Sequence, residues 1–138
     1  MASKWWSVVV DCADPRTLGR WWAEVLGFHV LYDSPGELVL IEGTAEQPRY
    51  PALVFVRVLE PKTRRNRLHL DLNPDDDEAE VTRLLALGAH RGDIRHDRVP
   101  WTVLTDPEGN EFCVLEPRPQ GPDADADSDA DSDADSRP

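Results

Sequence analysis

The 138-residue sequence lacks the features that define several protein classes. No stretch reaches the roughly 18 consecutive apolar residues of a membrane-spanning helix, and no apolar signal segment follows Met1, so we expect a cytoplasmic protein without membrane contact. Two cysteines, Cys12 and Cys113, cannot build a disulfide framework. Basic side chains are outnumbered, 15 against 27 acidic ones, and the net charge of −12 disfavours a nucleic-acid partner.

The acidity is concentrated at the C-terminal end of the chain. Residues 121–138 contain seven aspartates and one arginine, which account for half of the net charge. Their aspartates alternate with Ala and Ser, without a branched apolar or aromatic residue, so ordering this segment would bury nothing that offsets the lost chain entropy. We predict a disordered acidic tail at 119–138 and one folded domain at 1–118.

The folded part consists of two copies of one pattern. In the first copy, about residues 5–60, the apolar run Trp6–Cys12 predicts a strand. Asp14 and Pro15 are typical of a helix start, and Gly27 stands where a helix should end. Three more strands are predicted at 28–32, 37–42 and 52–59.

The second copy covers about residues 66–117. Leu68–Leu72 alternates like a strand, Asn73 and Pro74 predict a helix start, and Gly88 predicts its end. Further strands are predicted at 89–91, 101–105 and 111–116. The predicted fold class is therefore α+β, with two β-α-β-β-β modules packed together. The segment between them, Lys62–Arg67, is either an anion site or a solvated linker.

Three segments carry a family resemblance: Trp22–Phe28, where the helix ends in Leu-Gly-Phe; Leu68–Leu72; and Asp106–Phe112, which contains the turn Asp-Pro-Glu-Gly-Asn. Together they resemble the vicinal oxygen chelate superfamily, which contains glyoxalase I, extradiol dioxygenases, epimerases and bleomycin-resistance proteins. The small bacterial glyoxalase-like proteins are the most similar group. The resemblance implies two modules that form an incomplete barrel around a cleft, often assembled as a homodimer.

In metal-dependent members of this superfamily, four side chains from both modules hold a divalent ion. The resemblance puts these positions on Ser7, approximately Phe55, His69 and Cys113. Imidazole and carboxylate groups bind the metal in such sites, and serine and phenylalanine cannot replace them. We therefore expect no tightly held metal and no glyoxalase I activity, although His69 and Cys113 could form half of a soft-metal site.

Strand alternation predicts which side chains face the cleft. His69 with Asp71 is a candidate acid–base pair, because imidazole exchanges protons near neutral pH and a carboxylate can orient it. Arginine could hold an anionic oxygen, and tryptophan could stack on a planar ligand or pack in the core. The candidate ligand-binding residues are Trp6, Asp11, Phe55, Arg57, Arg67, Trp101, Glu111 and Cys113.

Two further tryptophans, Trp21 and Trp22, are neighbours in the first predicted helix. Adjacent residues cannot share one face of a helix, so we expect one indole in the core and the other at a flank.

Two functions are open at this point. The first is a protein that binds a small, possibly aromatic molecule in the cleft and needs no tightly held metal. The second is a lyase or isomerase that acts on a small carbonyl compound, using His69 with a carboxylate or a weakly bound divalent metal. A pure interaction module has only the acidic tail in its favour. Either main function fits a homodimer.

Overall fold

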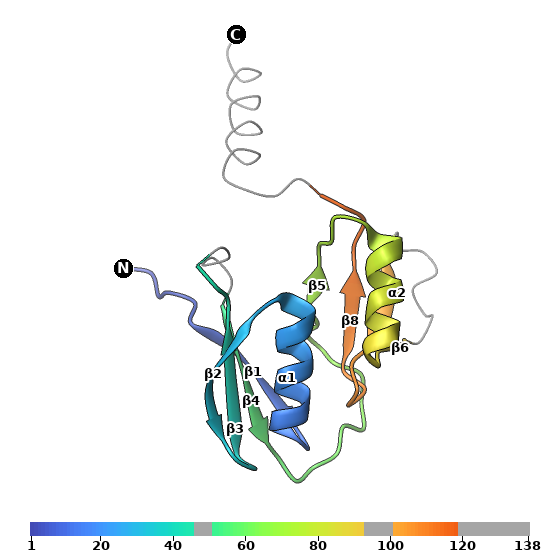
Figure 1. Cartoon of the computed structure of the whole chain (residues 1–138). Helices are drawn as coiled ribbons and strands as arrows, with labels where there is room; N and C mark the ends of the chain where they lie inside the picture. The colour runs from blue at the N-terminus through green and yellow to red at the C-terminus, as the bar shows by residue number, and fades with distance from the viewer. Residues whose placement is uncertain (46–50, 93–100, 119–138) are drawn as a thin grey trace.

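The structure is a computed structural model that describes residues 1–45, 51–92 and 101–118. The prediction of a disordered tail at 119–138 lies outside these ranges. The described chain forms two open four-stranded sheets, each with one helix (Figure 1). The first sheet contains β1 (Ser7–Cys12), β2 (His29–Ser34), β3 (Leu38–Glu42) and β4 (Ala52–Arg57). The second contains β5 (Asp71–Leu72), β6 (His90–Arg91), β7 (Thr102–Thr105) and β8 (Glu111–Val114).

Both sheets have the same topology. The strand order is β1-β4-β3-β2 in the first sheet and β5-β8-β7-β6 in the second. In the first sheet β1 runs parallel to β4, and in the second sheet β5 runs parallel to β8. All other neighbouring strands are antiparallel. The helices are α1 (Pro15–Leu26) and α2 (Asp77–Leu87), and each follows the first strand of its sheet. The predicted α+β class, built from two β-α-β-β-β units, is confirmed.

The first helix begins and ends as its sequence predicts. The Asp14 carboxylate accepts the backbone N–H of Thr17 at 3.2 Å, and Pro15 occupies the first turn, where a missing N–H costs nothing. At the other end, Gly27 has a left-handed backbone with φ of 66°, and its N–H closes the last turn on Ala23.

The second helix starts later than predicted. Asp76, not Asn73, is its N-cap, and the Asp76 carboxylate accepts the N–H of Ala79 at 3.0 Å. Asn73 instead forms a pair of hydrogen bonds with the backbone of Arg118, at 3.1 and 2.9 Å. Several aspartates in a row can each cap a helix, so composition alone does not select between them. The end of α2 at Gly88 is confirmed.

The strand β5 is shorter than the predicted Leu68–Leu72. Its ladder with β8 pairs Asp71 with Cys113 and Leu72 with Val114, whereas Leu68 is 89% exposed. Directly before the ladder, the C=O of Leu70 accepts the backbone N–H of Cys113 at 2.9 Å. Farther back, the Glu111 carboxylate accepts the backbone N–H of Asn66 at 2.9 Å.

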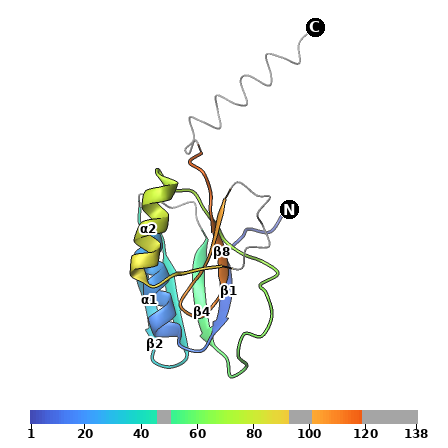
Figure 2. The ribbon, with the colours of Figure 1, turned by 90° about the vertical axis from the view of Figure 1, so that its right-hand side faces the viewer.

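Figure 2 shows α1 and α2 on one side of the molecule, with β1, β4 and β8 on the other, while β2 at the edge of the first sheet lies on the same side as α1. Both Trp21 and Trp22 are buried between the modules, where their rings pack edge-on with each other and with Phe112 of β8. The expectation that one indole lies at a flank is wrong, because the second module covers the side of α1 that the first leaves open. No helix in the described ranges is long and apolar enough to cross a membrane.

Candidate functional site

The face of the sheets turned away from the helices carries the candidate site, and we call it the open face. On β1, Cys12 is buried and Val8 and Val10 pack against the core, while Val9 is 58% exposed. Ser7, Val9 and Asp11 therefore lie on the open face, as predicted from the alternation of the strand.

On β4 the predicted alternation is wrong by one residue. Phe55 was expected on the open face, but it is fully buried and pairs in parallel register with Val10 of β1. Register partners in neighbouring strands share a face, so Phe55 points toward α1, and so does Arg57 at the exposed end of the strand. The sequence of β4 is apolar on both faces, so the pattern of residues does not show which face of the strand points toward the helix.

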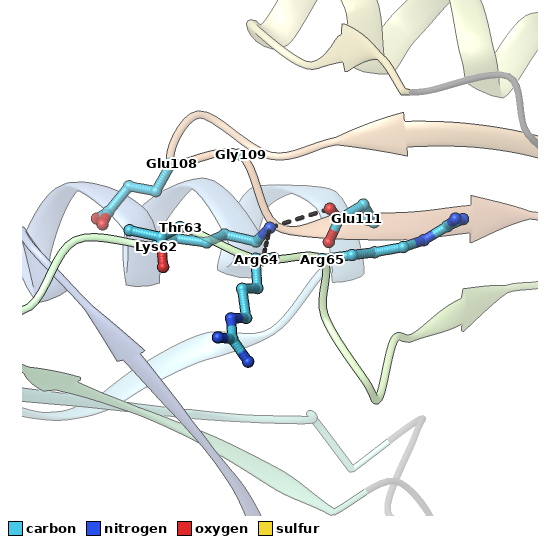
Figure 3. Close-up of a pocket in the computed structure, with 7 residues that line it drawn as sticks. All are labelled: Lys62, Thr63, Arg64, Arg65, Glu108, Gly109 and Glu111. Atoms are coloured by element: carbon cyan, nitrogen blue, oxygen red, sulfur yellow. Dashed lines mark hydrogen bonds and ion pairs between the residues drawn. The ribbon is translucent and has the colours of Figure 1, made fainter.

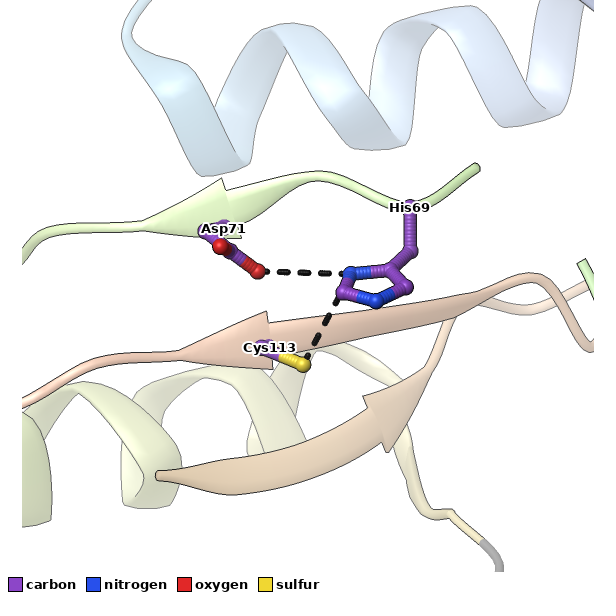
Figure 4. Close-up of side chains that lie close together, drawn as sticks. All are labelled: His69, Asp71 and Cys113. Carbon is purple, nitrogen blue, oxygen red and sulfur yellow. Dashed lines mark hydrogen bonds and ion pairs between the residues drawn. The ribbon is translucent and has the colours of Figure 1, made fainter. Parts of the chain in front are cut away.

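Three predicted site residues meet at the junction of β5 and β8. The Nδ1 atom of His69 lies 3.3 Å from Oδ1 of Asp71 and 3.8 Å from Sγ of Cys113 (Figure 4). The His69 and Asp71 side chains are about half exposed, and Cys113 is buried. We call these residues the β5–β8 cluster. Its place on the open face is as predicted, since the alternate residues Leu70, Leu72, Phe112 and Val114 pack into the core.

The surroundings of Cys113 keep its thiol protonated. Burial, followed by the nearby carboxylate of Asp71, raises the pKa of Cys113 to about 11, while Arg65 and a hydrogen bond with the Trp101 side chain act in the opposite direction. Trp101 is therefore close to Cys113, and the charge of Arg65 acts on the same thiol. A thiol with this pKa is a poor nucleophile at neutral pH unless another group removes its proton.

A cavity of about 400 Å³ lies between the segment that links the modules and the turn at Glu108 and Gly109. Its lining residues are Lys62, Thr63, Arg64, Arg65, Glu108, Gly109 and Glu111. Figure 3 shows the Lys62 ammonium meeting Glu111, 3.0 Å away, while the Arg64 side chain points away from that pair. Burial of Glu111 opposes its ionisation, but the Asn66 amide and the Lys62 ammonium outweigh burial, so the pKa of Glu111 is lowered.

The contact that Glu108 makes across the two modules was not predicted from the sequence. Glu108 accepts the backbone N–H groups of Ala13 at 2.6 Å and Asp14 at 3.1 Å, so it ties the second module to the start of α1. The segment Lys62–Arg67 was left as either an anion site or a linker, and nothing in its sequence signalled that Lys62 would bind Glu111.

The remaining predicted residues are spread over the surface. Trp6 is 82% exposed, and Asp11 and Arg67 are exposed as well. The structure thus brings together His69, Asp71 and Cys113, with Trp101 hydrogen-bonded to the thiol, and places Arg65 and Glu111 on the wall of the cavity.

Comparison with known proteins gives a family match over most of the chain. The profile of the family described as glyoxalase-like domain matches residues 7–115. No curated protein sequence matches significantly.

Solved structures with the same fold are numerous, and their sequences are distant. The chain is similar to a glyoxalase/bleomycin resistance protein/dioxygenase family enzyme from Burkholderia phytofirmans, with a TM-score of 0.62 and 16% identity over 80% of this chain and 95% of that one. The chain is also similar to a glyoxalase-related enzyme from Fulvimarina pelagi, with a TM-score of 0.63 and 17% identity over 88% of this chain and 95% of that one. For lactoylglutathione lyase from Agrobacterium tumefaciens the TM-score is 0.57, with 19% identity over 84% of this chain and 95% of that one. Because these sequence identities lie between 16% and 19%, the similarity shows a shared fold and does not extend to function.

Proposed function

The chain belongs to the glyoxalase-like domain family, within the vicinal oxygen chelate superfamily, and on this basis we propose that it binds a small, flat organic molecule on the open face beside β5 and β8. Binding does not require a tightly held metal ion.

The observation that carries this proposal is the chemistry of the first module's open face. The four-ligand set implied by the family would draw two ligands from β1 and β4. The open-face residues there are Ser7, Val9, Asp11, Ala52, Val54 and Val56. Asp11 is the one strong metal ligand among these six, and β4 offers only alkyl groups. The residues present do not fit the family's metal set.

Aromatic and cationic groups support a planar ligand. Trp101 lies beside Cys113, and Arg65 lies within electrostatic reach of the same thiol. An indole stacks on flat rings, and a guanidinium binds an oxygen anion through paired N–H donors. A flat molecule that carries an acidic oxygen would use both.

The test is a titration of the full chain with planar phenolic and quinone-like compounds, followed by tryptophan fluorescence and calorimetry. We expect quenching with saturable binding that is unchanged by a chelator. Trp101→Ala should weaken binding at least fivefold, a loss of about 1 kcal/mol for a removed stacking contact. Trp5→Ala is the matched control, because Trp5 is 75% exposed at the chain start. No saturable binding, or equal loss in both variants, contradicts the proposal.

A second function, a lyase or isomerase, is favoured by the His69–Asp71 pair. The carboxylate contacts Nδ1 at 3.3 Å, which leaves Nε2 as the ring atom free of this contact. An imidazole held in this way can remove a proton from carbon next to a carbonyl group and return it elsewhere, since a carboxylate stabilises the protonated ring. Arg65 could then hold the enolate oxygen.

Turnover of small 2-oxoaldehydes and of their thiol adducts separates the two functions. His69→Ala should abolish turnover if the chain is an enzyme, whereas His29→Gln should not. His29 is a fair control because it forms a similar surface pair with Glu42, at 3.6 Å. Binding without turnover supports the first function, and turnover that survives His69→Ala contradicts the second.

The proposal includes a cytoplasmic setting. Cys12 and Cys113 are both free and buried in different modules. Unpaired thiols suit a reducing compartment.

A further inference from the structure

The segment that links the two modules carries positive charge in a chain that is acidic as a whole. Four of the six residues in Lys62–Arg67 are basic, whereas the net charge of the chain is −12. Three of these four, Lys62, Arg64 and Arg65, line the cavity of about 400 Å³ described above. The contacts of the cavity wall favour the first of the two interpretations of this segment, an anion site rather than a solvated linker.

The two carboxylates in the cavity wall already have donors within the protein. Glu108 accepts a backbone N–H at the start of α1 on each of its two oxygens, at 2.6 and 3.1 Å. Glu111 accepts Lys62 Nζ at 3.0 Å on one oxygen and the backbone N–H of Asn66 at 2.9 Å on the other. Because these hydrogen bonds offset the negative charge of both groups, the wall retains an excess of donors.

The cations in the wall have fewer partners than they can bind. Lys62 Nζ contacts two acceptors, Glu111 and the C=O of Arg64 at 2.6 Å, and an ammonium group has a third N–H to donate. The Arg64 side chain points away from the Lys62–Glu111 pair (Figure 3). It has no hydrogen bond or ion pair with any residue in the described part of the chain. A guanidinium group in this state offers paired N–H donors to a carboxylate or a phosphate.

The cavity has room for more than a simple ion. Gly109 has a φ of 87°, and a Cβ built on it would meet no atom within 4 Å, so the turn leaves open space beside the cations. Small organic molecules occupy pockets from about 300 Å³ upward. We propose that this cavity binds a small organic oxyanion, a carboxylate or a phosphate monoester, through Lys62, Thr63 and Arg64. The site goes beyond the proposed function, because the open-face ligand uses none of these three residues.

The test is a titration of the full chain with inorganic phosphate, methyl phosphate and glutarate at constant ionic strength, followed by calorimetry and thermal unfolding. We expect saturable binding of one anion per chain and a raised unfolding temperature. Preference for methyl phosphate over glutarate identifies a phosphate site, and the reverse identifies a carboxylate site. The net charge of −12 repels anions in general, so binding that saturates at one site reports a local cluster of donors.

Variants assign the binding to the cavity. Arg64→Gln should weaken it roughly fivefold or more, because the guanidinium supplies charge-assisted hydrogen bonds. Arg20→Gln is the matched control, since Arg20 is an exposed arginine on α1 that pairs with Asp33 outside the cavity. Trp101→Ala, which tests the open-face ligand, should also leave anion binding unchanged, so the two proposals can fail separately.

Arg64 is exposed, so its variant is expected to fold, and circular dichroism checks this. No saturable binding of any of the three anions overturns the proposal, and so does an equal loss in Arg64→Gln and Arg20→Gln.

Discussion

Asp106 is a buried carboxylate that holds its own turn together and links that turn to α1 of the first module. It is 1% exposed and accepts Trp22 Nε1 at 3.0 Å, together with the backbone N–H groups of Glu108 and Asn110 and the Asn110 side chain. Charge-assisted hydrogen bonds of this kind offset the cost of burying the charge. The turn sequence that begins at Asp106 thus has a structural role, in addition to its value as a family signature.

Asp106→Asn should lower the free energy of unfolding by about 2–4 kcal/mol, because an amide presents a donor where several donors already converge. Urea unfolding measures the loss. In a Trp22→Phe background the same change should cost about 1 kcal/mol less, since the indole donor is gone. Asp33→Asn, which affects only an ion pair with largely exposed arginines, should cost less than about 1 kcal/mol. Equal costs in both backgrounds would contradict the assigned hydrogen bond.

At the scale of the element, α1 packs on the first sheet through a glycine. A Cβ at Gly19 would stand 2.8 Å from Cγ1 of Val39 and 3.2 Å from Cδ2 of Phe55. Such separations are shorter than van der Waals contact, so the missing side chain sets how closely helix and sheet approach.

Gly19→Ala should destabilise the fold although alanine favours a helix. The gain in propensity is about 1 kcal/mol, whereas overpacking costs about 1–3 kcal/mol. In a Val39→Ala background the substitution should become neutral or stabilising, as thermal and urea unfolding would reveal. Glu24→Ala, on the exposed face of α1, is the control and should change stability by less than about 0.5 kcal/mol. A stabilised Gly19→Ala single variant would refute the close approach.

Elements with distinct local chemistry could be predicted from the sequence. The limits of α1 follow from Asp14 and Gly27, and the end of α2 follows from Gly88. The start of α2 could not be assigned, because Asn73 and the aspartates after it are all good caps, and the choice depends on the distant backbone of Arg118. Tertiary contact, not propensity, selected Asp76.

The candidate site was predictable where polar and apolar residues alternate. His69 and Asp71 were assigned to the correct face because leucines separate them. Phe55 was misassigned because β4 is apolar throughout, and its phase follows only from its pairing with β1. The convergence of Asp71 and Cys113 on one nitrogen depends on strand register and rotamer, neither of which a sequence pattern encodes.

At the scale of the whole molecule, exposed apolar side chains indicate an uncovered surface. Val9 on the open face is 58% exposed, and Leu31 and Tyr32 on β2 are 55% and 57% exposed. Val9 lies on β1 and the other two residues lie on β2, which are the two edge strands of the first sheet, and an apolar side chain at a sheet edge is suited to contact with a second chain. The homodimer expected from the resemblance would cover the open face of the first module.

Sedimentation at micromolar concentration should therefore give a mass near twice 15.6 kDa. Val9→Glu should shift the chain to monomer, because a carboxylate buried in an apolar contact has no partner. Arg57→Glu, at the exposed end of β4 on the side facing α1, is the control and should leave the dimer intact. A wild-type monomer at this concentration would contradict the dimer.

The parallel pairing of β1 with β4 has a consequence for synthesis on the ribosome. Because Ser7 lies opposite Ala52, β1 has no sheet partner until β4 has emerged, yet it needs nothing from the second module. The first module can therefore close while the second is still being translated. During that interval Trp21 and Trp22 are without Phe112 and Asp106, and the nascent chain presents two uncovered indoles that are a natural target for chaperones.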